Sequence, residues 1–330
     1  MIQNILEIQP NKITNNIESY NFLLYSTPGI GKTTFAVNLF PEKHLILGAE
    51  FGYKGIPGAM GVPIPDYVTL LQYLEQLDTD EAREKYETLI VDTTTKVGEM
   101  IEEYILSMFG KDTMGECKAH GGAYPLINRY YNLVFNRLKA RGYNFVYICH
   151  ATWEDIKNEK NEVIGRKYKP KMSDRINSLI EPEVDYTFFL TLDVAGNRII
   201  VTDNTVKNVG KQRTNLPTVM LMDAEKFKEE FEKGVKEKAG DSLTTSKITN
   251  NVSGFKREQR DYKEVIREVK ELGRIATDNG KSNDAVAIVN NRLGKDDNGF
   301  QRTLDQCTQE NIEMLEAVSM ELKKLNDIKE

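Results

Sequence analysis

The chain has 330 residues, of which 40% are hydrophobic and 28% are charged, so a packed core is expected and a wholly disordered chain is excluded. Its 44 basic and 50 acidic residues give a net charge of −6. This balance excludes a protein that is basic over its whole surface, so any contact with nucleic acid must come from a local patch.

Three cysteines, Cys117, Cys149 and Cys307, lie far apart and match no zinc-ligand spacing, which favours a reducing compartment over a disulfide scaffold. The first residues lack the basic start and apolar block of a targeting signal, and no apolar run is long enough to span a membrane. We therefore expect a cytoplasmic protein with no membrane partner.

Short apolar segments alternate with helical patterns over the first half of the chain. The predicted strands cover residues 20–25, 44–48, 88–91 and 144–149. The predicted helices cover residues 33–40, 67–77, 97–109 and 126–138. This alternation is typical of an α/β fold with a doubly wound, mostly parallel sheet, which binds ligands at the carboxyl ends of its strands.

The pattern changes after residue 151. We predict a polar hairpin, two further strands and a helix that begins at Asp223, at residues 154–169, 186–192, 198–202 and 223–238. Small polar residues then predict a linker, and two amphipathic helices predict a small C-terminal helical module. The expected organisation is an α/β core over residues 1–238, a linker over 239–254 and a helical module over 255–330.

A glycine-rich segment between the first strand and the first helix matches the phosphate-loop pattern, except that Ser26 replaces the first glycine. Its residues are Ser26, Thr27, Pro28, Gly29, Ile30, Gly31, Lys32, Thr33 and Thr34. The glycines allow successive N–H groups to face an anion, Lys32 can reach the β and γ phosphates, and Thr33 can bind Mg²⁺. A chance match in a turn is the alternative, and the flanking strand and helix argue against it.

Two carboxylates follow neighbouring strands of the predicted sheet. Asp92 ends the apolar strand TLIV and can hold Mg²⁺ together with Thr33. No glutamate follows Asp92, so the base must come from elsewhere, and Glu50 after the second strand is the candidate that orients the attacking water. A helix-capping role for Asp92 and a solvated loop position for Glu50 are the alternatives.

This order of polar residues at strand ends resembles the RecA-like ATPase core over residues 20 to about 220. The segments STPGIGKTT, LILGAEFGYKG, LIVDTTT and VYICHA are similar to compact RecA-like P-loop ATPases of bacteriophages, which include the Sak-type single-strand annealing group. The resemblance implies an AAA-type protein that uses ATP and Mg²⁺ and acts on single-stranded DNA in recombination or replication. It also implies the host cytoplasm and a single-strand-binding protein as a further candidate partner.

The resemblance assigns roles to three more side chains. His150 after the fourth strand matches the place of a polar residue that senses the γ phosphate, although that residue is usually glutamine. Lys211 and Arg213 resemble the cations that hexameric members project into a neighbour's nucleotide site, which requires a homo-oligomeric ring or filament. A structural histidine and a loop with two surface cations are the alternatives.

The segment after His150 carries a local excess of basic residues. Residues 157–175 contain seven basic and three acidic side chains. The candidate single-stranded DNA contacts are Trp153, Arg166, Lys167, Tyr168, Lys169 and Lys171. A solvated hairpin with ordinary surface lysines is the alternative. Residues 110–122 form a second irregular stretch with weaker candidates, Lys111, Lys118 and His120.

Three functions remain open at the level of the sequence. The first is an ATP-dependent protein of phage recombination or replication that anneals or exchanges strands. The second is a DNA translocase or helicase-type motor on the same core. The third is a nucleotide-dependent scaffold that recruits a partner through its helical C-terminal module.

Overall fold

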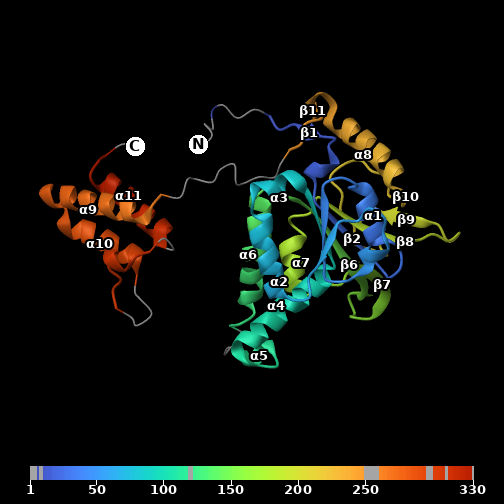
Figure 1. The fold of residues 1–330 in the computed structure, drawn as a ribbon, viewed down its shortest axis with the longest axis horizontal. Coiled ribbons are helices and arrows are strands. Elements are labelled where there is room, and N and C mark those ends of the chain that lie inside the picture. Colours follow the sequence, from blue (N-terminus) through green and yellow to red (C-terminus); the bar gives the residue numbers. More distant parts are fainter. Residues whose placement is uncertain are drawn as a thin grey trace. The chain divides into compact units, whose positions relative to one another are not determined.

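The computed structural model describes residues 6, 10–117, 122–248, 260–294, 300–308 and 311–328. The described residues divide into two compact units, one within residues 6–248 and one within residues 260–328. The first unit is built on a large sheet and the second is all-helical (Figure 1).

The sheet of the first unit has the order β10-β9-β8-β2-β6-β5-β3-β4, and β7 pairs with β6. The parallel strands are β2 (Phe22–Ser26), β3 (His44–Gly48), β4 (Gly61–Pro63), β5 (Thr88–Asp92), β6 (Asn144–Lys157) and β8 (Tyr186–Leu192). The antiparallel pairings involve β7 (Val163–Pro170), β9 (Arg198–Val201) and β10 (Val219–Leu221). The predicted α/β class with a mostly parallel sheet is confirmed.

Helices cover both faces of this sheet because the central strands carry apolar side chains on both faces. Phe22 and Leu24 pack with α1 (Lys32–Leu39) and α8 (Ala224–Ala239) on one face. Leu23 and Tyr25 face the opposite layer, which consists of α2 (Tyr67–Leu77), α4 (Thr94–Phe109), α6 (Pro125–Ala140) and α7 (Asp174–Ile180). The short helices α3 (Asp80–Lys85) and α5 (Met114–Cys117) complete this part of the chain. Such two-sided burial is what a parallel sheet requires.

Local signals fix where several helices begin. Asp66 accepts a hydrogen bond from Thr69 N at 2.7 Å and caps α2, and Asp223 accepts one from Lys226 N at 3.0 Å and caps α8. Pro125 occupies the first turn of α6, where its missing N–H costs nothing. The predicted start of α8 at Asp223 thus has a direct physical cause.

Strand β6 is longer than the sequence pattern suggested. We expected a strand to end at residue 149 and a separate hairpin to follow, but β6 continues through residue 157 and forms the first arm of the β6–β7 hairpin. The apolar pattern stops at Cys149 because the hairpin arm leaves the covered sheet and becomes solvated, whereas its backbone stays extended.

The stretch for which we predicted a linker contains structured residues at its start. A 3₁₀ turn, η5 (Gly240–Ser242), leads into β11 (Leu243–Thr244), which pairs in parallel with β1 (Ile13–Thr14). Residues 249–254 lie outside the described part of the chain. Within the described ranges, the other 3₁₀ turns are η2 (Ile17–Ser19), η3 (Gly52–Gly55) and η7 (Leu304–Gln306).

Where the structure describes the second unit, three helices pack around its own small core. They are α9 (Tyr262–Asp278), α10 (Ser282–Leu293) and α11 (Ile312–Leu325). The apolar face of α9 that the sequence predicted is buried here, with Val265 and Val269 against Leu315 and Leu322 of α11. That face is therefore an intramolecular core. Among the described residues, no helix is long and apolar enough to cross a membrane.

Candidate active site

The loop between β2 and α1 has the backbone shape of an anion-binding turn. Gly29 and Gly31 have φ values of +82° and +98°, a region that favours glycine. Gly31 caps α1, and Phe35 N donates to its carbonyl oxygen at 2.9 Å. The positive end of α1 and its free N–H groups therefore point into the loop, as phosphate binding requires.

Lys32 lies inside this loop with little exposure to solvent. Its ammonium donates to Ser26 Oγ at 3.0 Å, and its residue is only 7% exposed. Burial lowers the pKa of Lys32, although Asp92, Cys149 and Glu50 counteract this effect. Ser26 replaces the expected glycine without conflict, because it is the last residue of β2 and its hydroxyl accepts from the lysine that follows in the motif.

Thr33 and Asp92 meet at the carboxyl edge of the sheet. Thr33 Oγ1 donates to Asp92 Oδ2 at 2.7 Å. Asp92 is 3% exposed, and burial raises its pKa, as Glu50 also does, whereas the Thr33 hydrogen bond and Lys32 lower it. A hydroxyl and a buried carboxylate beside a phosphate loop match the small set of oxygen ligands that Mg²⁺ takes from a protein in addition to phosphate and water. These two side chains therefore fit the ion.

Glu50 lies beside Asp92 because β3 and β5 are neighbouring parallel strands. The backbone N–H groups of Ala49 and Glu50 both donate to Asp92 O, at 2.7 and 3.0 Å. Glu50 Oε1 accepts from Thr93 Oγ1 at 3.0 Å and lies 3.1 Å from His150 Nε2. The Glu50 side chain retains 35% exposure, so water can reach it. The predicted carboxylate pair is thus brought together at one edge of the sheet.

His150 reaches Glu50 from β6, where it pairs with Ser26 in register. We predicted that His150 ends its strand, and this is wrong, because β6 runs seven residues further to Lys157. His150 instead marks the point where β6 leaves β2 and begins to pair with β7. Its Nδ1 is buried without a hydrogen-bond partner among the described residues.

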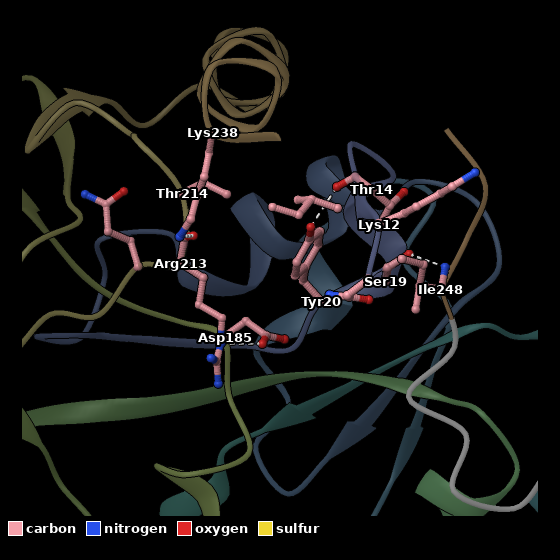
Figure 2. A pocket seen from close by; sticks show the side chains of 12 residues that line it. Lys12, Thr14, Ser19, Tyr20, Asp185, Arg213, Thr214, Lys238 and Ile248 are labelled. Carbon is pink, nitrogen blue, oxygen red and sulfur yellow. Dashed lines mark hydrogen bonds and ion pairs between the residues drawn. The ribbon is translucent and has the colours of Figure 1, made fainter. Parts of the chain in front are cut away.

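Lys211 and Arg213 lie at the other edge of the sheet. Lys211 Nζ donates to Glu181 O at 2.8 Å, and Arg213 Nε pairs with Asp185 Oδ1 at 2.7 Å. Asp185 precedes β8, so this pair sits at the amino end of the parallel strands, opposite the phosphate loop. Figure 2 shows Arg213 extending toward Asp185 beside a cavity of about 520 Å³. Neither cation contacts the phosphate loop of its own chain.

The hairpin formed by β6 and β7 exposes part of the predicted DNA surface. Trp153 is 57% exposed, and the Arg166 guanidinium lies over its ring at 5.6 Å. Arg166 and Lys169 pair with Asp155 and Glu154, at 3.2 and 2.8 Å.

The other candidates on β7 differ in their surroundings. Lys167 Nζ donates to Asn204 Oδ1 at 2.7 Å, a neutral partner. Tyr168 stacks on Phe189 with ring centroids 4.9 Å apart, so its ring is partly used by the core. The Lys171 backbone is held by His150 O and by Thr95 Oγ1. Lys111 is exposed, whereas Lys118 and His120 lie outside the described residues.

Sequence reasoning missed two parts of the site. Thr93, which holds Glu50, follows Asp92 directly and was available as a hydroxyl beside the predicted carboxylate. Arg198 begins β9 and Met222 directly follows β10, and both lie against Gly31 although they are more than 160 residues away from it in the sequence. No local pattern brings them to the loop, because only the strand order places β9 and β10 near it.

Comparison with known proteins gives the following matches. A model described as an AAA domain matches residues 18–214. An uncharacterized SPbeta prophage-derived protein of Bacillus subtilis (strain 168), YorG, is 23% identical over 98% of this chain and 99% of its own length. An ATPase from the type III secretion system of pathogenic bacteria aligns with 91% of this chain and 81% of its own, at 11% identity and a TM-score of 0.36, a likeness too low to bear on the fold.

The family match begins just before β2 and ends in the loop that follows β9. It therefore includes the phosphate loop and the strands β3, β5 and β6, which bring Glu50, Asp92 and His150 to that loop. Because the match spans more than half of the chain, the protein belongs to the AAA domain family of P-loop ATPases.

Proposed function

We propose that this ATPase acts on single-stranded DNA in phage recombination or replication, where it anneals or exchanges strands. The prophage origin of the relative of similar length supports a phage setting for this chain. The observation that carries the proposal is the continuity of β6, which holds His150 against Glu50 and three residues later presents Trp153 on an exposed hairpin.

The residues at the loop divide the work of hydrolysis. Lys32 and the N–H groups of the phosphate loop bind and orient the β and γ phosphates, and Thr33 and Asp92 would hold Mg²⁺. Mg²⁺ bound by these two side chains would supply positive charge to the transferring phosphoryl group. Glu50, held by Thr93 and His150, orients the attacking water.

A chain of direct contacts links this chemistry to the hairpin. Glu50 contacts His150, and the His150 carbonyl accepts from Lys171 N at 2.8 Å at the end of β7. The Lys171 carbonyl in turn accepts a hydrogen bond from Thr95 Oγ1 at 2.7 Å. Thr95 lies three residues after Asp92 in the sequence. A shift of either hairpin strand therefore changes the environment of Glu50, which is the physical basis for DNA-stimulated turnover in this proposal.

The same proposal assigns Lys211 and Arg213 to a neighbouring copy in a ring or filament. Their position at the amino edge of the strands keeps them away from the loop of their own chain but available to another. A guanidinium delivered there would neutralise charge on the phosphoryl group. The neighbour's site must then compete with Asp185 for Arg213.

The first test measures phosphate release with and without circular single-stranded DNA. We expect stimulation by DNA in the wild-type protein, no turnover for Lys32→Ala, and loss of most turnover for Glu50→Gln. Trp153→Ala should keep basal turnover and lose the stimulation. The exposed Arg129 on α6 gives a matched control, since Arg129→Ala should retain both activities. Full turnover of Glu50→Gln, or stimulation that survives Trp153→Ala, would contradict the proposal.

The second test separates the kinds of action on DNA. An annealing protein speeds the pairing of complementary strands without a free end, whereas a motor unwinds a duplex with polarity. For the hairpin, Lys167→Glu should lower the salt dependence of DNA binding by about 0.7 in the log–log slope for each phosphate that the variant no longer neutralises. Unwinding with polarity would favour the motor. A log–log slope that Lys167→Glu leaves unchanged would show that Lys167 is not part of the DNA-binding surface.

A further inference from the structure

Two side chains from distant strands lie against the phosphate loop. A Cβ built on Gly31 would lie 3.4 Å from Met222 Cε and 3.6 Å from Arg198 Nη1. Both distances correspond to contact between neighbouring groups. Arg198 and Met222 therefore cover one side of the glycine that precedes Lys32.

The strand geometry explains why these two residues reach the loop. Arg198 begins β9 and pairs with Leu192, the last residue of β8, so β9 starts at the carboxyl edge of the sheet. Met222 N donates to Arg198 O at 2.9 Å, which continues the β9–β10 ladder by one residue. Residues opposite each other in an antiparallel pair project their side chains to the same face. Figure 1 shows β9 and β10 on the same side of the unit as α1.

The pair combines a free cation with a soft apolar group. Arg198 is exposed, and among the described residues it forms no ion pair with a carboxylate. Met222 is half-buried and packs on the apolar cluster under α1 and α8. This guanidinium thus lies, available to a ligand, beside a loop whose N–H groups already favour anions.

The order of the sheet tells which part of a bound nucleotide lies near this pair. Glu50, Asp92 and His150 come from β3, β5 and β6, which lie on one side of β2. The terminal phosphate must lie on that side to meet them. Arg198, which begins β9, and Met222, which directly follows β10, lie beyond β8 on the other side of β2. A triphosphate laid across the loop therefore extends its nucleoside toward them.

We propose that Arg198 and Met222 bind the base of the nucleoside triphosphate. The planar guanidinium of Arg198 lies against the face of the ring, and the Met222 thioether packs against the ring from the loop side. The assignment rests on the proposed ATPase chemistry of the loop, and it adds a contact that depends on the nucleoside and not on the phosphates.

The test compares two ligands by calorimetry in the presence of Mg²⁺. One is the non-hydrolysable ATP analogue AMP-PNP, and the other is inorganic tripolyphosphate, which has no nucleoside. We expect Arg198→Ala to weaken AMP-PNP binding about five- to thirty-fold and to change tripolyphosphate binding by no more than about twofold. Met222→Ala should weaken AMP-PNP binding about two- to ten-fold.

Two further variants make the result specific. Arg198→Lys keeps the charge and loses the planar group, so it should remain weak for AMP-PNP, whereas Arg129→Ala on α6 should bind both ligands like the wild type. Equal weakening of both ligands by Arg198→Ala would place the guanidinium on the phosphates and overturn the proposal, as would an unchanged affinity for AMP-PNP. A wild-type protein that bound neither ligand would instead remove the ATPase function on which the proposal rests.

Discussion

Asp92 carries an electrostatic cost that its protein neighbours relieve only in part. Its carboxylate is almost fully buried, Glu50 adds a second negative charge nearby, and its direct hydrogen bond comes from the neutral Thr33 hydroxyl. Burial of a charge without a full set of partners disfavours the ionised form. The residue is thus arranged for a cation and, by itself, is unfavourable for stability.

Asp92→Asn should raise the free energy of unfolding at pH 7 by about 0.5–2 kcal/mol without nucleotide, and it should abolish Mg²⁺-dependent turnover. The pKa of Asp92 is raised in the folded protein, so between the ordinary aspartate pKa and this raised pKa the folded state binds more protons than the unfolded state. The stability of the wild type therefore falls as the pH rises through that range. The gain should therefore shrink as the pH falls toward the ordinary aspartate value. Denaturant titrations at several pH values measure it, and a gain that grew at low pH would contradict the sign.

In the proposed mechanism, Thr93 acts through Glu50 as a positioning residue. It is 1% exposed, caps α4 and donates to Glu50 Oε1. Thr93→Val keeps the shape and removes the hydroxyl, so we expect kcat to fall about tenfold with KM nearly unchanged. Thr93→Ser should restore most of kcat. Steady-state kinetics decide the point, and a rise in KM with an unchanged kcat would indicate a role in binding instead.

The predicted residues that the structure brings together around the loop belong to short continuous patterns. The phosphate loop, Asp92 and Glu50 each follow directly on an apolar strand, and parallel strands bring their carboxyl ends to one edge. Arg198 and Met222 had no such signal, since each contacts Gly31 only through the order of the strands. Lys211 and Arg213 were chosen by resemblance. They lie in the loop between β9 and β10, which places them at the amino edge of the parallel strands.

At the scale of elements, Tyr53 packs against Gly48 and Gly61 and so fixes the loop that carries Glu50. A Cβ on Gly48 would lie 2.3 Å from Tyr53 Cε1, and a Cβ on Gly61 would lie 2.8 Å from Tyr53 Cδ2 and Cε2. Gly48 ends β3 and Gly61 begins β4, so the ring of Tyr53 closes over both strands. This packing holds the turn η3 close to the sheet and gives Glu50 a defined position.

Gly48→Ala should displace Tyr53 and lower kcat by at least about tenfold, with a loss of about 1–3 kcal/mol in the free energy of unfolding. Gly52→Ala in the same loop is the matched control, because a Cβ there meets no heavy atom within 4 Å. Turnover and thermal melts of the two variants measure the effect. Equal behaviour of the two would show that Tyr53 does not position the loop.

The length of β6 shows a limit of sequence patterns at this scale. The core part of β6 is uniformly buried and reads clearly as a strand, but the part beyond His150 is polar and partly exposed. A pattern based on burial therefore ends the strand where only its surroundings change. For the same reason the two-residue strand β11, whose pairing with β1 lies between distant segments, carried no local signal.

At the scale of the whole molecule, the proposal needs a second copy of the chain. Arg213 and the phosphate loop occupy opposite edges of one sheet, separated by the length of β2. One chain thus carries Arg213 at one edge and, at the other, the phosphate loop that would receive the arginine of a neighbouring chain. In the proposed assembly this contact is heterologous, and its repetition would generate a ring or a filament.

Mixed oligomers test this arrangement. Lys32→Ala and Arg213→Ala should each be inactive alone, whereas an equal mixture should recover up to about a quarter of wild-type turnover, because random assortment gives that share of sites an intact loop and an intact arginine from different chains. Phosphate release after mixing, with mass measurements in the presence of nucleotide, provides the readout. No recovery in an assembled mixture would remove Arg213 from the neighbour's site.

The position of Trp153 on β6 has a practical consequence. It is the only tryptophan in the sequence, it is exposed, and it follows His150 by three residues, about 10 Å along an extended strand. Its indole emission is therefore a built-in optical reporter of the hairpin, without any dye. A spectral change on adding AMP-PNP alone, before any DNA is present, would follow in real time how far the nucleotide signal travels along the strand.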